Sequence, residues 1–253
     1  MKASVDFLIA GTQKGGTSSL DACLRGHPDI DMALGKEPHF FDNEDLFRAG
    51  FPGDAQYHAN FPPHVPGRLR GEATPIYMYW REVAARVHRY NPGMKWIILL
   101  RNPIGRAYSH WNMERGRKAE NLPFLEALRA EGERLRSALP LQHRVFSYVD
   151  RGFYGGQLQR IWSLFPRSQT LILRSDVFRR DPKTVLNAVH RFLGVREVPP
   201  EREMKENSGV YPAGMGREAW EYLRGVFEPE IRSLESLLGW DCRDWLAPSV
   251  SMV

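Results

Sequence analysis

A glycine-rich turn near the N-terminus carries the residues best suited to bind a phosphate. The apolar run Val5–Ala10 predicts a buried strand, the turn spans Gly11–Gly16, and a helix is expected to begin near Thr17. Glycines let backbone N–H groups converge on an anion, and a helix N-terminus adds about half a positive charge. Lys14 adds a full positive charge, and the hydroxyls of Thr17 and Ser18 can donate hydrogen bonds. The segment therefore predicts a phosphate-binding turn.

The spacing within this turn differs from that of nucleoside triphosphatases, which read Gly-x-x-x-x-Gly-Lys-Ser/Thr. Gly11 and Gly16 have that spacing, but Thr17 stands where the lysine would be, and Lys14 precedes the second glycine. The turn therefore disfavours a nucleoside triphosphatase. A tight turn with an incidental lysine is the alternative, and the predicted strand before it and helix after it argue against that alternative.

A second cationic position follows the clearest strand of the sequence, Trp96–Leu100. Arg101 comes next, Pro103 suits the first turn of a helix, and Ser109 lies a little over two turns along that helix. Phosphoryl-transfer enzymes that use Mg²⁺ commonly have an acidic residue at such a strand end. Arginine instead binds phosphate oxygens in a fork, although a surface arginine beside a solvated serine is the alternative. The two positions together predict a nucleotide phosphorylated at two places and no metal site.

The elements that position these residues alternate between strands and helices. Further strands are predicted at Ile30–Leu34 and Thr170–Leu173, and the proline-, glycine- and aromatic-rich residues 51–71 predict irregular structure. Helices are predicted from Thr17, from Pro103 and at Trp80–Tyr90, Phe124–Leu139, Tyr154–Phe165, Val185–Leu193 and Ala219–Leu238. This order predicts one doubly wound α/β domain covering residues 1–253, with a parallel sheet flanked by helices on both faces. Ligands of such sheets bind beyond the carboxyl ends of the strands, where both motifs fall.

The composition excludes several classes of protein. The chain is 42% hydrophobic and 26% charged, unlike disordered or fibrous proteins. Its 35 Lys and Arg against 30 Asp and Glu favour an anionic partner, but scattered charges and the lack of a nucleic-acid motif favour a small polyanion over nucleic acid. Cys23 and Cys242 have no disulfide or metal-ligand spacing. With no membrane-length apolar run and no signal-peptide pattern, we expect a cytoplasmic protein.

The motifs resemble those of sulfotransferases that use 3′-phosphoadenosine 5′-phosphosulfate (PAPS), most closely the heparan sulfate and bacterial carbohydrate-type branch. Phe7–Leu20, FLIAGTQKGGTSSL, resembles the 5′-phosphosulfate loop, and Lys95–Ser109, KWIILLRNPIGRAYS, resembles the 3′-phosphate strand, turn and helix. Lys36–Asp42, KEPHFFD, resembles the branch's acid-x-His-Phe-Phe segment, and later similar stretches are Gly152–Phe165 and Asp176–Gly194. The resemblance implies a P-loop-like fold, PAPS as the sulfuryl donor and 3′,5′-phosphoadenosine (PAP) as its product.

The resemblance also implies which residues contact the nucleotide. Within the two main motifs they are Gln13, Lys14, Gly15, Gly16, Thr17, Ser18, Arg101 and Ser109. Lys205–Pro212, KENSGVYP, is loosely similar to the nucleotide-covering loop and adds Ser208, Gly209 and Tyr211. Lys14 is further implied to contact the bridging or sulfuryl oxygens as charge builds on the leaving phosphate, and such stabilisation is typically the largest catalytic term. PAP departs as a stable anion, so neither a dedicated acid nor a metal is implied.

Glu37 is the predicted general base, because the matching family position is a carboxylate with that role. A base of this kind contributes about 10²–10⁴ in rate. The alternatives for Glu37 are a pair with Lys36 or a turn cap. His39 is the rival base, since imidazole titrates near neutral pH, and a structural histidine is its alternative. Glu72 is a third candidate or an acceptor-orienting group, and Tyr154 and Gln157 could contact the acceptor.

The predicted reaction is a metal-free, in-line transfer of a sulfuryl group from PAPS to the hydroxyl of a carbohydrate or small-molecule alcohol. Related glycosaminoglycan enzymes often have an acidic-Lys-Ser-Pro segment where this chain has Glu72-Ala73-Thr74-Pro75, which disfavours a highly sulfated glycan. A small-molecule kinase with a P-loop is one alternative, and Mg²⁺ dependence with ATP turnover would support it. A nucleotide-binding module without catalysis is the other.

Overall fold

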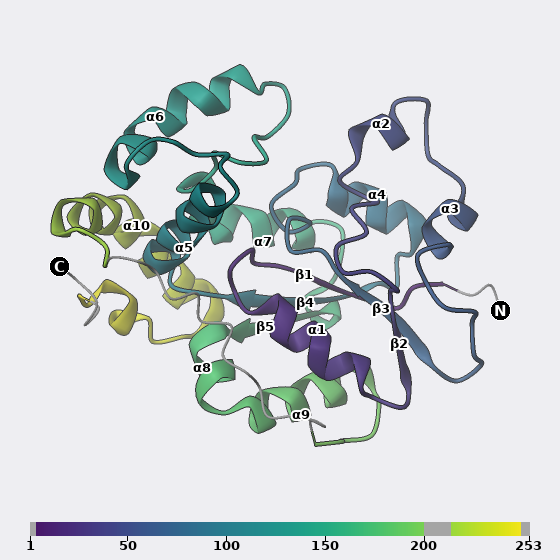
Figure 1. Ribbon diagram of the computed structural model, residues 1–253. Helices are drawn as coiled ribbons and strands as arrows, with labels where there is room; N and C mark the ends of the chain where they lie inside the picture. Colours follow the sequence, from purple (N-terminus) through teal and green to yellow (C-terminus); the bar gives the residue numbers. More distant parts are fainter. Residues whose placement is uncertain (1–3, 200–213, 249–253) are drawn as a thin grey trace. The chain divides into compact units, whose positions relative to one another are not determined.

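The computed structural model describes residues 4–199 and 214–248, and Figure 1 traces their helices and strands. These residues group into two compact units. The first takes its described residues from 4–100 and 160–199, and the second from 101–159 and 214–248. The single domain predicted over residues 1–253 stays a prediction.

A five-stranded parallel sheet forms the centre of the first unit. Its strands are β1 (Phe7–Gly11), β2 (Ile30–Met32), β3 (Leu69–Ala73), β4 (Lys95–Leu100) and β5 (Thr170–Arg174). Their order is β2-β3-β1-β4-β5, and every pairing is parallel. The strand order reverses at β1, which lies between β3 and β4, and doubly wound sheets bind ligands at such a reversal. The predicted parallel sheet is confirmed.

Helices cover both faces of this sheet because its central strands are apolar at almost every position. One face packs against α1 (Thr17–Arg25), α8 (Ser175–Arg180) and α9 (Pro182–Leu193), with strand residues that include Phe7, Ile9, Ile97 and Leu99. On the other face Trp96 contacts Phe165, and Phe165 contacts His88 of α4 (Val83–Tyr90). Figure 1 shows α4 across the sheet from α1 and α9. Side chains alternate between the faces of a strand, so burial of both faces requires this continuous apolar pattern.

Strand β3 overturns part of the sequence prediction, because it begins within residues 51–71, which were predicted to be irregular. The short helix α3 (Asp54–His58) also lies there. The sequence of β3, Leu-Arg-Gly-Glu-Ala, is polar, so its pattern did not predict a buried strand. The buried guanidinium of Arg70 donates to the carbonyl of Pro62 at 2.9 Å, and a Cβ on Gly71 would lie 2.1 Å from the ring of Phe7. These partners are distant in sequence, so a local pattern could not reveal them.

The predicted helices lie close to their predicted places, whereas α2 (Glu44–Phe47), α8 and the 3₁₀ turns were not predicted. The first unit also contains α2 and a 3₁₀ turn at Arg167–Gln169, and α7 spans Tyr154–Trp162. The second unit contains α5 (Pro103–Gly116), α6 (Phe124–Ser137), α10 (Arg217–Leu238) and 3₁₀ turns at Asp150–Gly152 and Arg243–Leu246. Pro103 opens α5 as predicted, and Asn102 caps it by accepting the Ile104 N–H at 3.0 Å.

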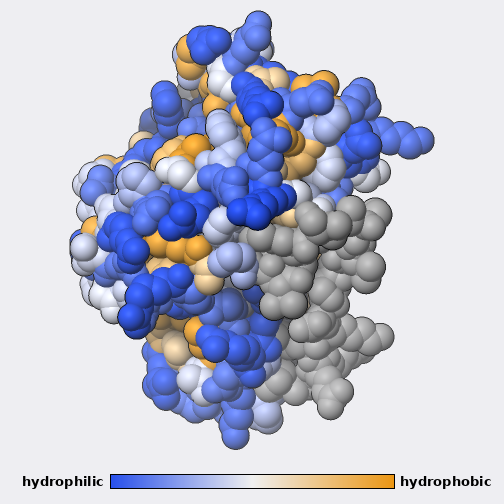
Figure 2. All heavy atoms as spheres, turned by 90° about the vertical axis from the view of Figure 1, so that its left-hand side faces the viewer, coloured by the Kyte–Doolittle hydropathy of each residue, from blue (hydrophilic) through white to orange (hydrophobic). Residues whose placement is uncertain are grey.

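Polar residues cover most of one face of the molecule (Figure 2). The face drawn in Figure 2 is mostly hydrophilic, with small apolar patches between the charged residues. In the part of the chain that the structure describes, no helix combines the length and apolarity needed to cross a membrane.

Candidate active site

The predicted phosphate-binding turn begins at the end of β1 and is fastened to β4. The N–H and the hydroxyl of Thr12 both donate to the carbonyl of Leu99, each at 2.9 Å. The Gly15 N–H donates to the Thr12 carbonyl at 2.8 Å, and a Cβ on Gly15 would lie 2.6 Å from the Leu99 oxygen. Gly16 adopts a φ of 102°, which L side chains rarely tolerate, and caps α1. The fold itself therefore requires glycine at both positions.

The polar residues of the turn lie where the sequence predicted. Gln13 and Lys14 are half-buried between β1 and α1. Thr17 and Ser18 are the first two residues of α1, whose opening N–H groups have no partner within the helix. The first turn of α1 contains no acidic residue that would offset this positive end. The turn thus brings Gln13, Lys14, Gly15, Gly16, Thr17 and Ser18 together in an electropositive setting.

Arg101 and Ser109 belong to the second unit and flank the first two turns of α5. Arg101 is the residue that follows the last residue of β4, and its guanidinium nitrogens lie 3.8 and 3.9 Å from the place of a Cβ on Gly105. The side chain of Arg101 therefore lies against the first turn of α5. Ser109 is 1% exposed, so the alternative of a solvated serine is wrong. The nucleotide contact of both residues stays a prediction.

Glu37, His39 and Asp42 form one hydrogen-bonded series. The Nδ1 atom of His39 lies 2.9 Å from Oδ2 of Asp42, and Nε2 lies 3.4 Å from Oε2 of Glu37. Lys36 donates to Oε1 of Glu37 at 2.6 Å. The side chain of Asp42 is 0% exposed, so a buried carboxylate fixes the orientation of the imidazole. The structure therefore brings both predicted base candidates together and adds Asp42, which the sequence analysis did not select.

The contacts in this series set the charges of Glu37 and His39. Partial burial opposes the charge on Glu37, but hydrogen bonds from His39 and Lys36 outweigh it and lower the pKa of Glu37 to about 2. Hydrogen bonds to Asp42 and then Glu37 raise the pKa of His39 to about 9. At neutral pH Glu37 is a carboxylate and His39 an imidazolium, so both ring nitrogens of His39 donate.

The three predicted catalytic residues share an uncommon backbone conformation. Lys14, Glu37 and His39 have φ values of 70°, 58° and 51°. Across residues 4–199 and 214–248, Lys118 is the one other non-glycine residue with positive φ. Left-handed conformations of this kind are unfavourable for non-glycine residues and concentrate at functional sites. The backbone therefore marks the same residues that the motifs select.

Glu37 and Lys14 follow the ends of neighbouring strands. The Glu37 N–H donates to the carbonyl of Ala73, the last residue of β3, at 3.1 Å. β3 pairs with β1, with Ile9 opposite Ala73, and the turn that carries Lys14 follows β1. Parallel strands end at the same edge of a sheet. Both residues therefore lie at the carboxyl edge of the sheet in the first unit.

Glu72 has no surface exposed, although the sequence analysis considered it as a base or an acceptor-orienting group. Its Oε1 accepts a hydrogen bond from the Tyr57 hydroxyl at 2.6 Å, and its Oε2 accepts one from Thr74. Tyr77 is a further buried neighbour of Glu72. Burial raises the pKa of Glu72 to about 7 against these hydrogen bonds. Contact with an acceptor stays a prediction, and the present partners of Glu72 are internal.

Tyr154 and Gln157, the other predicted acceptor contacts, are also buried. The Tyr154 hydroxyl donates to the carbonyl of Arg101 at 2.8 Å. The Gln157 amide donates to the carbonyls of Phe153 at 2.8 Å and Arg151 at 3.2 Å. Both side chains thus hold backbone of the second unit, and their acceptor contact stays a prediction. Ser208, Gly209 and Tyr211 lie outside the described residues.

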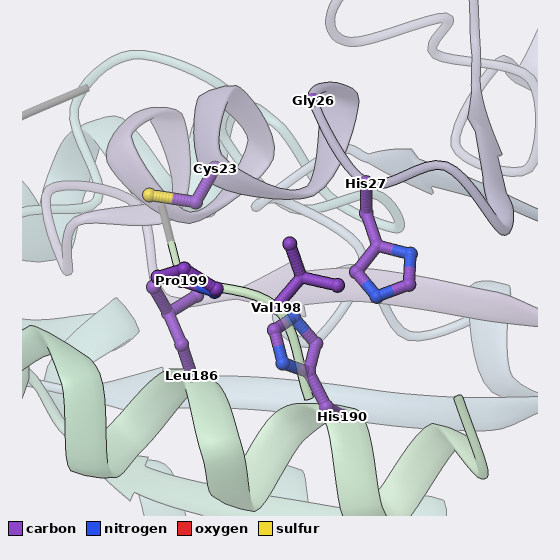
Figure 3. Close-up of a pocket in the computed structure, with 7 residues that line it drawn as sticks. All are labelled: Cys23, Gly26, His27, Leu186, His190, Val198 and Pro199. Atoms are coloured by element: carbon purple, nitrogen blue, oxygen red, sulfur yellow. The ribbon is translucent and has the colours of Figure 1, made fainter. Parts of the chain in front are cut away.

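A small pocket of the first unit lies apart from these residues. Figure 3 shows it between the end of α1 and α9, lined by Cys23, Gly26, His27, Leu186, His190, Val198 and Pro199. None of the sequence-predicted site residues lines it. In residues 4–199 and 214–248, no group of three His, Cys, Asp or Glu side chains could hold a metal ion.

Asp42 is the functional residue that sequence reasoning missed. It falls within the quoted KEPHFFD segment, three residues after His39. That spacing was the available signal, because a carboxylate close to a histidine commonly orients the imidazole. The two intervening phenylalanines are both buried.

Comparison with known proteins agrees with this fold and shows the family. The sulfotransferase domain family matches residues 4–207. Heparan sulfate glucosamine 3-O-sulfotransferase 6 from Homo sapiens is 34% identical over 201 residues, which cover 79% of this chain and 55% of the human protein. A sulfotransferase structure from Alicyclobacillus acidocaldarius is 30% identical with a TM-score of 0.82, covering 97% of this chain and 100% of that one. Mouse sulfotransferase SULT7A1 complexed with PAP shares the fold, with 19% identity, a TM-score of 0.50 and coverage of 78% and 61%.

The fold and the matched residues define a P-loop-like α/β protein of the kind that transfers sulfuryl groups. The chain belongs to the sulfotransferase domain family. It spans about half the length of the curated relatives that it matches, with 55% of the human 3-O-sulfotransferase 6 and 48% of the mouse 3-O-sulfotransferase 3B1 covered.

Proposed function

We propose that this chain transfers a sulfuryl group from PAPS to a hydroxyl of its acceptor, with Lys14 as the stabilising cation and Glu37 as the general base. Membership of the sulfotransferase family supports the reaction class. The observation that carries catalysis, beyond nucleotide binding, is the series Glu37–His39–Asp42, with contacts of 3.4 and 2.9 Å. A module that only bound nucleotide would not need an ionised carboxylate held in this way at the sheet edge.

The donor groups of the first unit suit the phosphosulfate end of PAPS. Lys14 supplies a cation, Thr17 and Ser18 supply hydroxyls, and α1 directs its N-terminus to the same turn. Arg101 would hold the 3′-phosphate through its planar guanidinium, with Ser109 as a second contact. We expect Arg101 and Ser109 to distinguish PAP from nucleotides without a 3′-phosphate.

Transfer requires one bond to form, one to break and one proton to move. The acceptor oxygen bonds to sulfur while the bond from sulfur to the bridging phosphate oxygen breaks, and PAP leaves with that electron pair. Glu37 takes the hydroxyl proton from the acceptor. Lys14 stabilises the negative charge that develops on the leaving side. His39 stays protonated and keeps Glu37 oriented, as Asp42 keeps His39 oriented.

For Glu37 to act as an effective base, binding of the acceptor must raise its pKa. With Lys36 on Oε1 and His39 beside Oε2, Glu37 has a pKa of about 2 and is a weak base. We infer that the acceptor hydroxyl takes the place of Lys36 at Oε1. Loss of the lysine contact and further desolvation both raise the pKa of a carboxylate, which brings Glu37 closer to the range of an effective base.

A carbohydrate is the acceptor class that we propose first. The human relative at 34% identity is named for the 3-O-sulfation of glucosamine in heparan sulfate. Ala73 is buried in β3 at 1% exposure, where related glycosaminoglycan enzymes often have lysine, so this cation is missing here. We therefore expect a neutral or weakly charged carbohydrate hydroxyl rather than a highly sulfated glycan. The cytoplasmic location expected from the sequence stays a prediction.

The test is transfer of label from ³⁵S-labelled PAPS to a panel of sugars, oligosaccharides and simple alcohols, with mass spectrometry of the product. We expect a product 80 Da heavier than its acceptor, the mass of a sulfuryl group replacing a proton, formed without Mg²⁺. Lys14→Ala should abolish transfer. Incorporation from labelled ATP with Mg²⁺, and none from PAPS, would favour the kinase alternative instead. Binding of PAP without transfer to any acceptor would favour the inactive module.

A further inference from the structure

Glu72 is buried beneath the turn that carries the proposed base. It lies on β3 opposite Leu8 of β1 and is 0% exposed. Two hydroxyls donate to its carboxylate, Tyr57 at 2.6 Å and Thr74. Buried Tyr77 is a further close neighbour of Glu72. A buried carboxylate is costly unless it is hydrogen-bonded, so these donors indicate a specific structural purpose.

Tyr77 connects Glu72 to the turn. Its hydroxyl accepts the backbone N–H groups of Phe40 at 3.0 Å and Phe41 at 3.3 Å, and Tyr77 is also a close neighbour of Glu72. Phe40 and Phe41 are the two residues between His39 and Asp42. Tyr77 therefore holds the backbone that spaces the imidazole from its carboxylate, next to the buried carboxylate of Glu72.

Tyr57 adds a second connection between Glu72 and the same two residues. Its ring stacks on Phe40 with a centroid distance of 4.6 Å and meets the ring of Phe41 at 4.8 Å. On the far side of the turn, Arg86 donates to the carbonyl of Phe41 at 2.8 Å and pairs with Glu44. The Phe40–Phe41 backbone is thus held at its N–H groups and at a carbonyl.

We propose that Glu72 is a positioning residue for the Glu37–His39–Asp42 series, acting through Tyr77 and Tyr57 rather than by touching the acceptor. The expected change in kcat rests on the proposed function. The expected change in the orientation of His39 rests on the geometry alone. This role differs from the one expected from the sequence, where Glu72 was a candidate base or acceptor-orienting group.

The test is Glu72→Gln, compared with Tyr77→Phe and with Tyr90→Phe as the matched control. Glutamine keeps the shape of Glu72, but its amide nitrogen cannot accept a hydrogen bond. Tyr90 lies in the same aromatic cluster, 5.2 Å from Tyr57, and its hydroxyl accepts from the Val5 N–H at 2.9 Å. Each tyrosine variant loses one hydroxyl. The Tyr77 hydroxyl accepts the N–H groups of Phe40 and Phe41, whereas Tyr90 meets the turn only through its ring, 5.6 Å from that of Phe41, and phenylalanine keeps this contact.

We expect Glu72→Gln and Tyr77→Phe to lower kcat by up to about 10²-fold, the effect of a misplacement of about 1 Å at the reacting groups. The KM for the acceptor and the Kd for PAP should change less than about twofold, because neither variant removes a proposed contact with either ligand. Tyr90→Phe should keep the kcat of the wild type. A raised acceptor KM with unchanged kcat in Glu72→Gln would assign Glu72 to the acceptor and overturn the proposal.

A titration of the His39 ring by NMR, without any nucleotide, separates this proposal from the proposed function. If Glu72 positions the turn, the pKa of His39 falls in Glu72→Gln and Tyr77→Phe and is unchanged in Tyr90→Phe. This result would support positioning even if the wild type transferred no sulfuryl group. An unchanged His39 titration in both variants would overturn the proposal, and Tyr77→Phe decides the matter should Glu72→Gln fail to fold.

Discussion

At the scale of single residues, the proposed chemistry depends on how Glu37 and His39 share charge. The His39 pKa of about 9 lies above the ordinary value of 6.5. The pairing therefore stabilises the folded protein fully below pH 6.5, and this contribution is lost as the pH rises through about 9. For Glu37 the pKa shift is downward from 4.5 to about 2, so its contribution is full above pH 4.5 and is lost as the pH falls through about 2.

These charges give opposite pH profiles for the two candidate bases. If neutral His39 accepted the proton, kcat would rise about tenfold per pH unit below the His39 pKa, because only the neutral imidazole is a base. With Glu37 as base, we expect kcat to change less than about twofold between pH 7.5 and pH 8.5, since both groups keep their charges there. Steady-state rates with saturating donor and acceptor measure this difference.

Substitution of Glu37 complements the pH profile. We expect Glu37→Gln to reduce kcat by about 10²–10⁴, the range of a lost general base. Its Kd for PAP should stay near that of the wild type, because Glu37 makes no proposed contact with the nucleotide. Near-normal turnover in Glu37→Gln would exclude it as the base.

The sequence predicted these residues unevenly, for physical reasons. Lys14, Glu37 and His39 belong to local motifs, so residue type and spacing were enough to select them. The role proposed for Glu72 depends on Tyr57 and Tyr77, fifteen residues before it and five residues after it. A buried network of this kind forms only when α3 and β3 pack together. Residue spacing in the sequence therefore does not predict it.

At the scale of elements, the phosphate-binding turn depends on close contact between β1 and β4. Gly15→Ala would place a Cβ 2.6 Å from the Leu99 oxygen and 2.7 Å from Oγ1 of Thr12. Backbone must then move, and the turn that carries Lys14 moves with it. We expect Gly15→Ala to lower the thermal stability and to abolish detectable PAP binding, measured by calorimetry.

Gly225→Ala is the control for this substitution. Gly225 is exposed within α10, and a Cβ there would meet no atom within 4 Å. Replacing glycine by alanine inside an exposed helix stabilises it by about 1 kcal/mol. Unchanged PAP binding in Gly15→Ala would contradict the tight fit described for the turn.

The same contrast explains how far the elements could be predicted. Strands β1, β4 and β5 are strongly apolar, so their pattern identified them and the parallel sheet. β3 was missed because two of its five residues are charged and one is glycine. Their partners, such as the ring of Phe7 over Gly71, come from other strands and become visible only in three dimensions.

At the scale of the whole molecule, the proposed nucleotide contacts come from both units. Lys14 belongs to the first unit and Arg101 to the second, and the chain passes directly from β4 to Arg101. The family assignment covers residues 4–207 and so includes both residues. PAP has a 5′-phosphate for the motif that contains Lys14 and a 3′-phosphate for the motif that contains Arg101. Binding of PAP therefore tests both motifs.

Calorimetric titration with PAP and with 5′-AMP tests whether this chain recognises the 3′-phosphate of the nucleotide through Arg101. We expect the wild type to bind PAP at least about tenfold more tightly than 5′-AMP, because hydrogen bonds from a charged group to the 3′-phosphate contribute about 1.5–3 kcal/mol. Arg101→Ala should remove this preference and leave the affinity for 5′-AMP unchanged. Equal affinities for the two nucleotides in the wild type, or a preference that survives in Arg101→Ala, would contradict the account.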